Sequence, residues 1–70
     1  MPGSQRAGDA AMRALQGDFN QLVDEAVQRK FKLQLHALEG QLEDKGTDPA
    51  FVKKVEALHE QVKTALAKQQ

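Results

Sequence analysis

The chain has 70 residues, ten basic and ten acidic side chains, and no cysteine, tyrosine or tryptophan. This length allows one domain at most, and the absence of cysteine excludes disulfides as a source of stability. The zero net charge excludes a strong overall attraction to nucleic acid or anionic membranes, although a local patch could still bind either. No Cys/His spacing suggests a structural zinc site, so we expect the chain to associate with a second copy or with another protein.

The N-terminal residues 1–8 contain two glycines, one proline and a single charged side chain, Arg6. Because they cannot bury enough apolar area to offset the entropy of ordering, we predict a disordered arm. The segment lacks the apolar core of a signal peptide, and no apolar run in the chain approaches the roughly 20 residues of a membrane span. We therefore expect a cytoplasmic protein with no membrane partner.

Residues 9–44 are predicted to form one long helix. Asp9 is a suitable N-cap, because its carboxylate can accept hydrogen bonds from the free amides of the first turn. Asp9 with Arg13, and Glu25 with Arg29, are spaced i,i+4 with the acid first, which is the more favourable order. The long helix is therefore supported at its start and near its middle.

The weak point of this helix is Gly17, because glycine costs about 1 kcal/mol relative to alanine inside a helix. The residues after it could start a new helix, with Asp18 as N-cap and Gln21 reaching back to complete a capping box. We predict a continuous helix and keep two alternatives. One is a restart at Asp18, and the other is a bend at Gly17 that folds the N-terminal segment back as a third helix.

A turn at residues 45–48 and a second helix at about 49–68 complete the predicted fold. Asp48 is expected to cap this helix, and Pro49 occupies the first helical position, where its missing N–H is no loss. Its apolar residues have the 4-3-4-3 spacing of coiled-coil-like packing: Phe51, Val55, Leu58, Val62 and Ala65. The chain is thus predicted to be an all-α, antiparallel helical hairpin that assembles into a homodimeric or heteromeric bundle.

The long helix carries two apolar stripes that point in different directions. The first stripe is predicted as the partner or dimer interface and comprises Leu15, Phe19, Leu22, Val23, Ala26 and Val27. The second is predicted to pack on the chain's own second helix and comprises Phe31, Leu35, Leu38 and Leu42. A helix of about 30 Å folded back on one of about 50 Å leaves the first stripe uncovered. The alternative is one drifting stripe that a supercoil absorbs.

No residue cluster predicts catalysis or cofactor binding. The only serine, Ser4, lies in the predicted arm, and a nucleophile with an oriented base needs a rigid pocket that two helices do not provide. His36 and His59 should lie at similar heights in a hairpin, but their surroundings favour ordinary surface roles over a zinc site. We therefore predict a non-enzyme without a metal or a cofactor.

A modest basic patch is the basis of a second functional hypothesis. It comprises Arg29, Lys30, Lys32 and Lys63, and it makes nucleic-acid binding possible. In layout the predicted hairpin resembles Rop-type RNA-binding dimers and small bacterial secretion co-chaperones, although no motif of either family is present. The first hypothesis is a regulatory or chaperone-like protein–protein interaction module, and the alternatives are a secretion co-chaperone or a Rop-like nucleic-acid-binding dimer.

Overall fold

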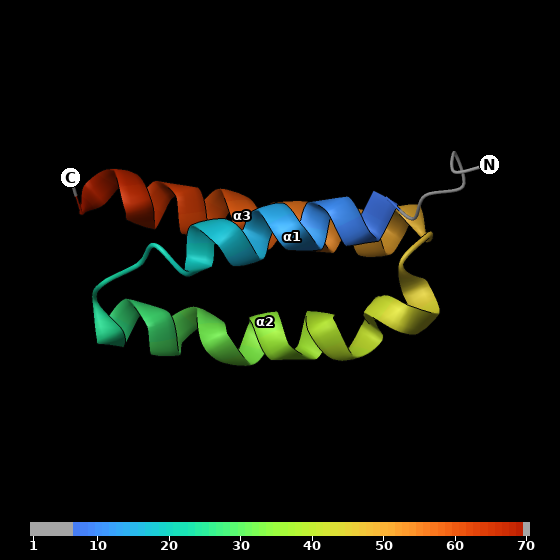
Figure 1. Cartoon of the computed structure of the whole chain (residues 1–70), viewed down its shortest axis with the longest axis horizontal. Helices are drawn as coiled ribbons and strands as arrows, with labels where there is room; N and C mark the ends of the chain where they lie inside the picture. The colour runs from blue at the N-terminus through green and yellow to red at the C-terminus, as the bar shows by residue number, and fades with distance from the viewer. Residues whose placement is uncertain (1–6, 70) are drawn as a thin grey trace.

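The computed structural model describes residues 7–69, and this part of the chain folds into three α-helices without a β-strand (Figure 1). They are α1 (Ala7–Phe19), α2 (Glu25–Lys45) and α3 (Pro49–Lys68). α1 and α3 run in the same direction, and α2 runs antiparallel to both. The most extensive contact in the bundle is between α1 and α3. The prediction of an all-helical protein is therefore confirmed.

The prediction of a two-helix hairpin with one helix over residues 9–44 is wrong. The chain leaves the helix after Phe19 and re-enters it at Glu25, so its first half is two helices joined by a short loop. This corresponds to the third-helix alternative, but the break does not occur at Gly17, which lies inside α1. The arm predicted over residues 1–8 falls mainly outside the described residues, and Ala7 and Gly8 belong to α1.

Local hydrogen bonds explain the position of the break. Asp24 is the N-cap of α2, and its side chain accepts a 2.9 Å hydrogen bond from the backbone N–H of Ala26. The side-chain amide of Gln28 reaches back and donates to the carbonyl of Leu22 in the loop. The side chains that begin α2 therefore satisfy backbone groups that a continuous helix would otherwise have bonded internally.

The loop is also fastened to the end of α3 by one side chain. The amide nitrogen of Gln69 donates to the carbonyl of Gln21 at 2.9 Å, and its amide oxygen accepts from the N–H of Val23 at 3.3 Å. These two bonds connect residues far apart in the sequence. They place the loop beside the C-terminal end of α3, as Figure 1 shows.

Burial of apolar side chains explains why the chain folds back instead of continuing straight. Met12, Leu15 and Leu22 all belong to the common core, with Leu15 fully buried. Removing a side chain of this size from water contributes about 1.5–3 kcal/mol. A backbone hydrogen bond contributes only about 1 kcal/mol net, and most bonds lost at the break are replaced. The free energy gained by burying these side chains therefore exceeds the cost of breaking a helix that Gly17 and Asn20 already weaken.

The second stripe and the third helix pack as the sequence predicts. The buried residues of α2 and α3 are Phe31, Leu35, Leu38, Phe51, Val55, Leu58 and Val62, and Leu42 is partly buried against them. The predicted start of the last helix is also confirmed, because the side chain of Asp48 accepts from the N–H of Ala50 at 2.9 Å and Pro49 follows the cap. Predicted intramolecular packing is therefore confirmed for α2 and α3.

A contact between two glycines joins the start of α1 to the turn between α2 and α3. The N–H of Gly8 donates a 2.7 Å hydrogen bond to the carbonyl oxygen of Gly46. A Cβ atom on Gly8 would lie 2.6 Å from that oxygen and 2.9 Å from the Gly46 Cα atom. Only a residue without a side chain allows the two backbones to approach so closely.

This contact makes Gly8→Ala a test of the bundle. We expect the substitution to destabilise the protein by about 1–3 kcal/mol, because the added methyl group meets backbone atoms that cannot move aside easily. Gly40→Ala is the matched control, since nothing lies within 4 Å of the position of its Cβ atom. Alanine there should stabilise α2 by about 1 kcal/mol. Urea unfolding followed by circular dichroism measures both, and equal stabilisation by both substitutions would contradict the docked position of α1.

Candidate functional site

The six residues of the predicted interface do not share one surface. Leu15 and Leu22 are buried in the core, and Phe19 and Val27 are half-buried against it. Only Ala26 and Val23 are exposed, with 75% of Val23 accessible. The expectation of an uncovered stripe is therefore wrong. The first helix folds back onto α3, and four of the six side chains are buried or half-buried within the chain itself.

Two of the four residues of the predicted nucleic-acid patch line different grooves. Lys30 lines a groove between α2 and α3, whereas Lys63 lines a different groove between α1 and α3. Arg29 lies 4.0 Å from Glu25, and Lys63 lies 3.4 Å from Glu60. Two of the four cations are thus close to carboxylates, which reduces the local positive charge available to nucleic acid.

The two histidines are placed in separate polar contacts. His36 Nδ1 lies 2.9 Å from an oxygen of Glu39, whose other oxygen accepts a 2.7 Å hydrogen bond from the side-chain amide of Gln16 on α1. His59 bonds Asp18, which links α3 to the end of α1. Within residues 7–69, no three His, Cys, Asp or Glu side chains come close enough together to hold a metal ion. The histidine contacts therefore serve as links within and between helices.

These contacts also lower the pKa of one carboxyl group, that of Glu39. The hydrogen bond from His36, and then that from Gln16, hold the pKa of Glu39 below its ordinary value of 4.5. Burial acts weakly in the opposite direction. The carboxylate is favoured because both donors stabilise its charged form. Glu39 is thus a pH-sensitive link between α1 and α2.

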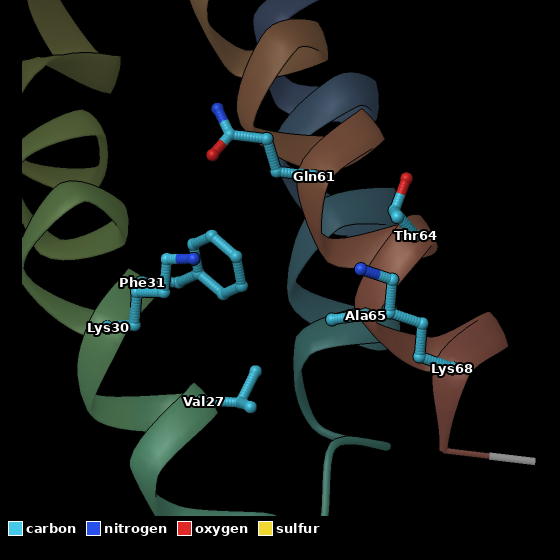
Figure 2. Close-up of a pocket in the computed structure, with 7 residues that line it drawn as sticks. All are labelled: Val27, Lys30, Phe31, Gln61, Thr64, Ala65 and Lys68. Carbon is cyan, nitrogen blue, oxygen red and sulfur yellow. The ribbon is translucent and has the colours of Figure 1, made fainter.

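A concave surface lies between α2 and α3. Figure 2 shows the pocket that begins it, with Val27, Lys30 and Phe31 from α2 facing the C-terminal half of α3. α3 contributes Gln61, Thr64, Ala65 and Lys68. The pocket has a volume of about 370 Å³. Its lining is mainly apolar or uncharged, and Lys30 and Lys68 are its two charged residues.

A second pocket continues this surface toward the turn between α2 and α3. It has a volume of about 330 Å³ and shares Gln61 with the first. Its other lining residues are Gln34, Ala37 and Leu38 from α2, and Lys54, Ala57 and Leu58 from α3. We call the two pockets together the α2–α3 groove. The described residues that line it all belong to α2 and α3, so α1 does not fill it.

The charge of the α2–α3 groove has one sign. Among its described lining residues, Lys30, Lys54 and Lys68 are cationic and no side chain is acidic. Lys30 lies 5.5 Å from the centre of the Phe31 ring, and neither Lys54 nor Lys68 forms an ion pair with a carboxylate of residues 7–69. The protein as a whole is neutral, so this local excess of positive charge distinguishes the groove from the rest of the chain.

The groove walls follow helical spacing that is visible in the sequence. On α3 the residues Lys54, Ala57, Gln61, Thr64 and Lys68 recur every three or four positions, and on α2 so do Lys30, Gln34 and Ala37. This spacing places each set along one face of its helix. The sequence places Lys30 in the predicted basic patch but does not predict the groove, because nothing in the spacing shows that the two rows face each other.

Comparisons with known proteins provide no further assignment. No protein-family model, curated protein or solved structure matches the chain. None of the helices in residues 7–69 combines the length and the apolar character needed to cross a membrane. The candidate site is therefore defined by its geometry and its charge.

The burial pattern gives a prediction about the residues that the sequence assigned to an interface. Leu15→Ala should destabilise the fold by about 2–5 kcal/mol, because it leaves a cavity in the core. Val23→Ala should change the free energy of unfolding by no more than about 0.5 kcal/mol, since that side chain is exposed. Urea unfolding and light scattering on the same samples distinguish a core role from an interface role. If Leu15→Ala altered only the association state, with normal stability, the core assignment would be wrong.

The lowered pKa of Glu39 gives a prediction about acid stability. A carboxyl group whose pKa is lower in the folded state stabilises the fold above its unfolded pKa, and this contribution is lost as the pH falls through the folded value. Stability should therefore decline below about pH 4.5, and Glu39→Gln should reduce the decline. Glu43→Gln, at an exposed position of the same helix, is the control. Urea midpoints measured from pH 6 to pH 3 test this, and identical profiles for the wild type and Glu39→Gln would rule the link out.

Proposed function

We propose that this protein is a non-enzymatic protein–protein interaction module and that its docking surface is the α2–α3 groove. The observation that carries this proposal is the alignment of two pockets along the same pair of helices. They share Gln61 and have Phe31, Leu38 and Leu58 among their apolar lining residues. An amphipathic helix laid into an apolar groove is a common mode of peptide recognition.

The dimensions of the groove favour a helix over a small molecule. Each pocket is near the lower limit of about 300 Å³ for small-molecule sites, but the two together extend along most of α3, from Lys54 to Lys68. Ala37, Ala57 and Ala65 line the walls, and small side chains allow another helix to approach closely. A docked helix would convert the three helices into a four-helix bundle.

The apolar surface that remains open to a partner lies in the α2–α3 groove. The first apolar stripe is satisfied within the chain, so it no longer requires association. The α2–α3 groove retains apolar surface at half-buried Val27 and Ala65, with exposed alanines beside them. Binding at this surface adds to the fold without dismantling it. The proposed role is therefore recognition by an already folded module.

The test uses a synthetic helical peptide of about 18 residues with leucines on one face and glutamines elsewhere. We expect its addition to shift backbone amide resonances of groove residues, including Ala57 and Gln61, in the NMR spectrum of the labelled protein. Ala37→Trp should abolish these shifts by filling the groove. Ala14→Trp, an exposed alanine in the groove between α1 and α3, should leave them intact.

Two results would overturn the proposal. One is the absence of shifts at millimolar peptide, and the other is a set of shifts on α1 that Ala37→Trp does not affect. Circular dichroism of both tryptophan variants shows whether each keeps its helical fold, so that loss of binding is not mistaken for unfolding.

A further inference from the structure

We infer that the occupant of the α2–α3 groove is an amphipathic helix of another protein, with acidic side chains at both ends of its apolar stripe. This inference rests on the proposed function and specifies the chemistry of the partner. The groove provides three lysines and no carboxylate among its described lining residues. A helix with acidic ends is therefore complementary in charge, and one with basic ends is repelled.

The positions of the lysines define where the acidic residues must lie. Lys54 and Lys68 are fourteen residues apart on α3, a separation of about 21 Å along the helix axis. Lys30 lines the same pocket as Lys68, so two cations mark one end of the groove and one cation marks the other. A partner helix that lies along the groove meets them with acidic residues about four turns apart.

The residues between these lysines determine which side chains suit the middle of the partner helix. Leu38 and Leu58 line the groove near Lys54, and Phe31 lines it near Lys30. Gln61 and Thr64 provide uncharged polar groups at the margin. A charged side chain placed over such a surface would lose water without gaining an ion pair. The matching segment of the partner is therefore apolar, with charge only at its ends.

Charge also argues against a second copy of this chain as the occupant. A two-fold symmetric dimer places the same surface of both copies together, so each groove would face the lysines of the other. Like charges in that arrangement repel. Nucleic acid is a poor match as well, because two of the three lysines are separated by apolar and uncharged residues instead of forming a continuous basic stripe.

The experiment compares three labelled peptides that share one leucine face and differ only at their ends. The ends carry glutamates about four turns apart, glutamines at the same places, or lysines. Binding is measured by fluorescence anisotropy at about 50 mM and about 500 mM salt. We expect the glutamate peptide to bind about tenfold more tightly than the glutamine peptide at low salt, as three exposed ion pairs allow. The advantage should shrink at high salt.

Variants of the protein assign the effect to the groove. The double substitution Lys54→Gln and Lys68→Gln should remove most of the preference for the glutamate peptide and leave binding of the glutamine peptide unchanged. Lys63→Gln, in the groove between α1 and α3, should preserve the preference. All three lysine positions are exposed, so these variants are expected to fold normally.

Each other outcome has a definite meaning. Equal binding of the three peptides would overturn the acidic-helix inference while leaving the groove as a docking surface. Failure of all three peptides to bind would overturn the proposed function itself. A molar mass that rises to a dimer in light scattering, and returns to a monomer in Ala37→Trp, would show that a second copy occupies the groove and would also refute the inference.

Discussion

Burial of the apolar face of α3 is the interaction on which the rest of this structure depends. Phe51, Val55 and Val62 are at most 2% exposed, although α3 is a single amphipathic helix at the end of a short chain. One neighbouring helix is too narrow to exclude water from a face of this width. Two helices are needed, and the chain provides both by breaking its first half into α1 and α2.

The break has a direct consequence for which apolar side chains the chain buries by itself. A continuous first helix would leave Leu15 and Leu22 exposed and would make a partner necessary for folding. Once α1 is docked, the same side chains stabilise the single chain. The contact between Gly8 and Gly46 at one end of α1, and the bond between Asp18 and His59 at the other, hold it in that position.

The asymmetric position of α1 explains why a groove exists. α1 packs mainly on α3, and residues of α2 and α3 line a long channel that α1 does not occupy. Alanines and uncharged polar residues line both walls, with Lys54 toward one end and Lys30 and Lys68 toward the other. The protein is neutral overall, but this channel combines apolar lining residues with a local excess of positive charge. Under the proposed function, this charge and shape would favour a helical partner with acidic ends.

The sequence by itself determined the all-helical class, the capped start of α3 at Asp48 and the core positions of α2 and α3, because hydrophobic periodicity and capping are local signals. It did not determine that the first half breaks between Phe19 and Glu25. The cap at Asp24 and the bond from Gln28 to Leu22 are local, but the break also depends on burial against α3 and on the bonds between Gln69 and the loop, which no local pattern contains. The groove was likewise decided by tertiary structure. Its two rows of residues are regular in the sequence, but only packing brings α2 and α3 together with their lysines along one channel.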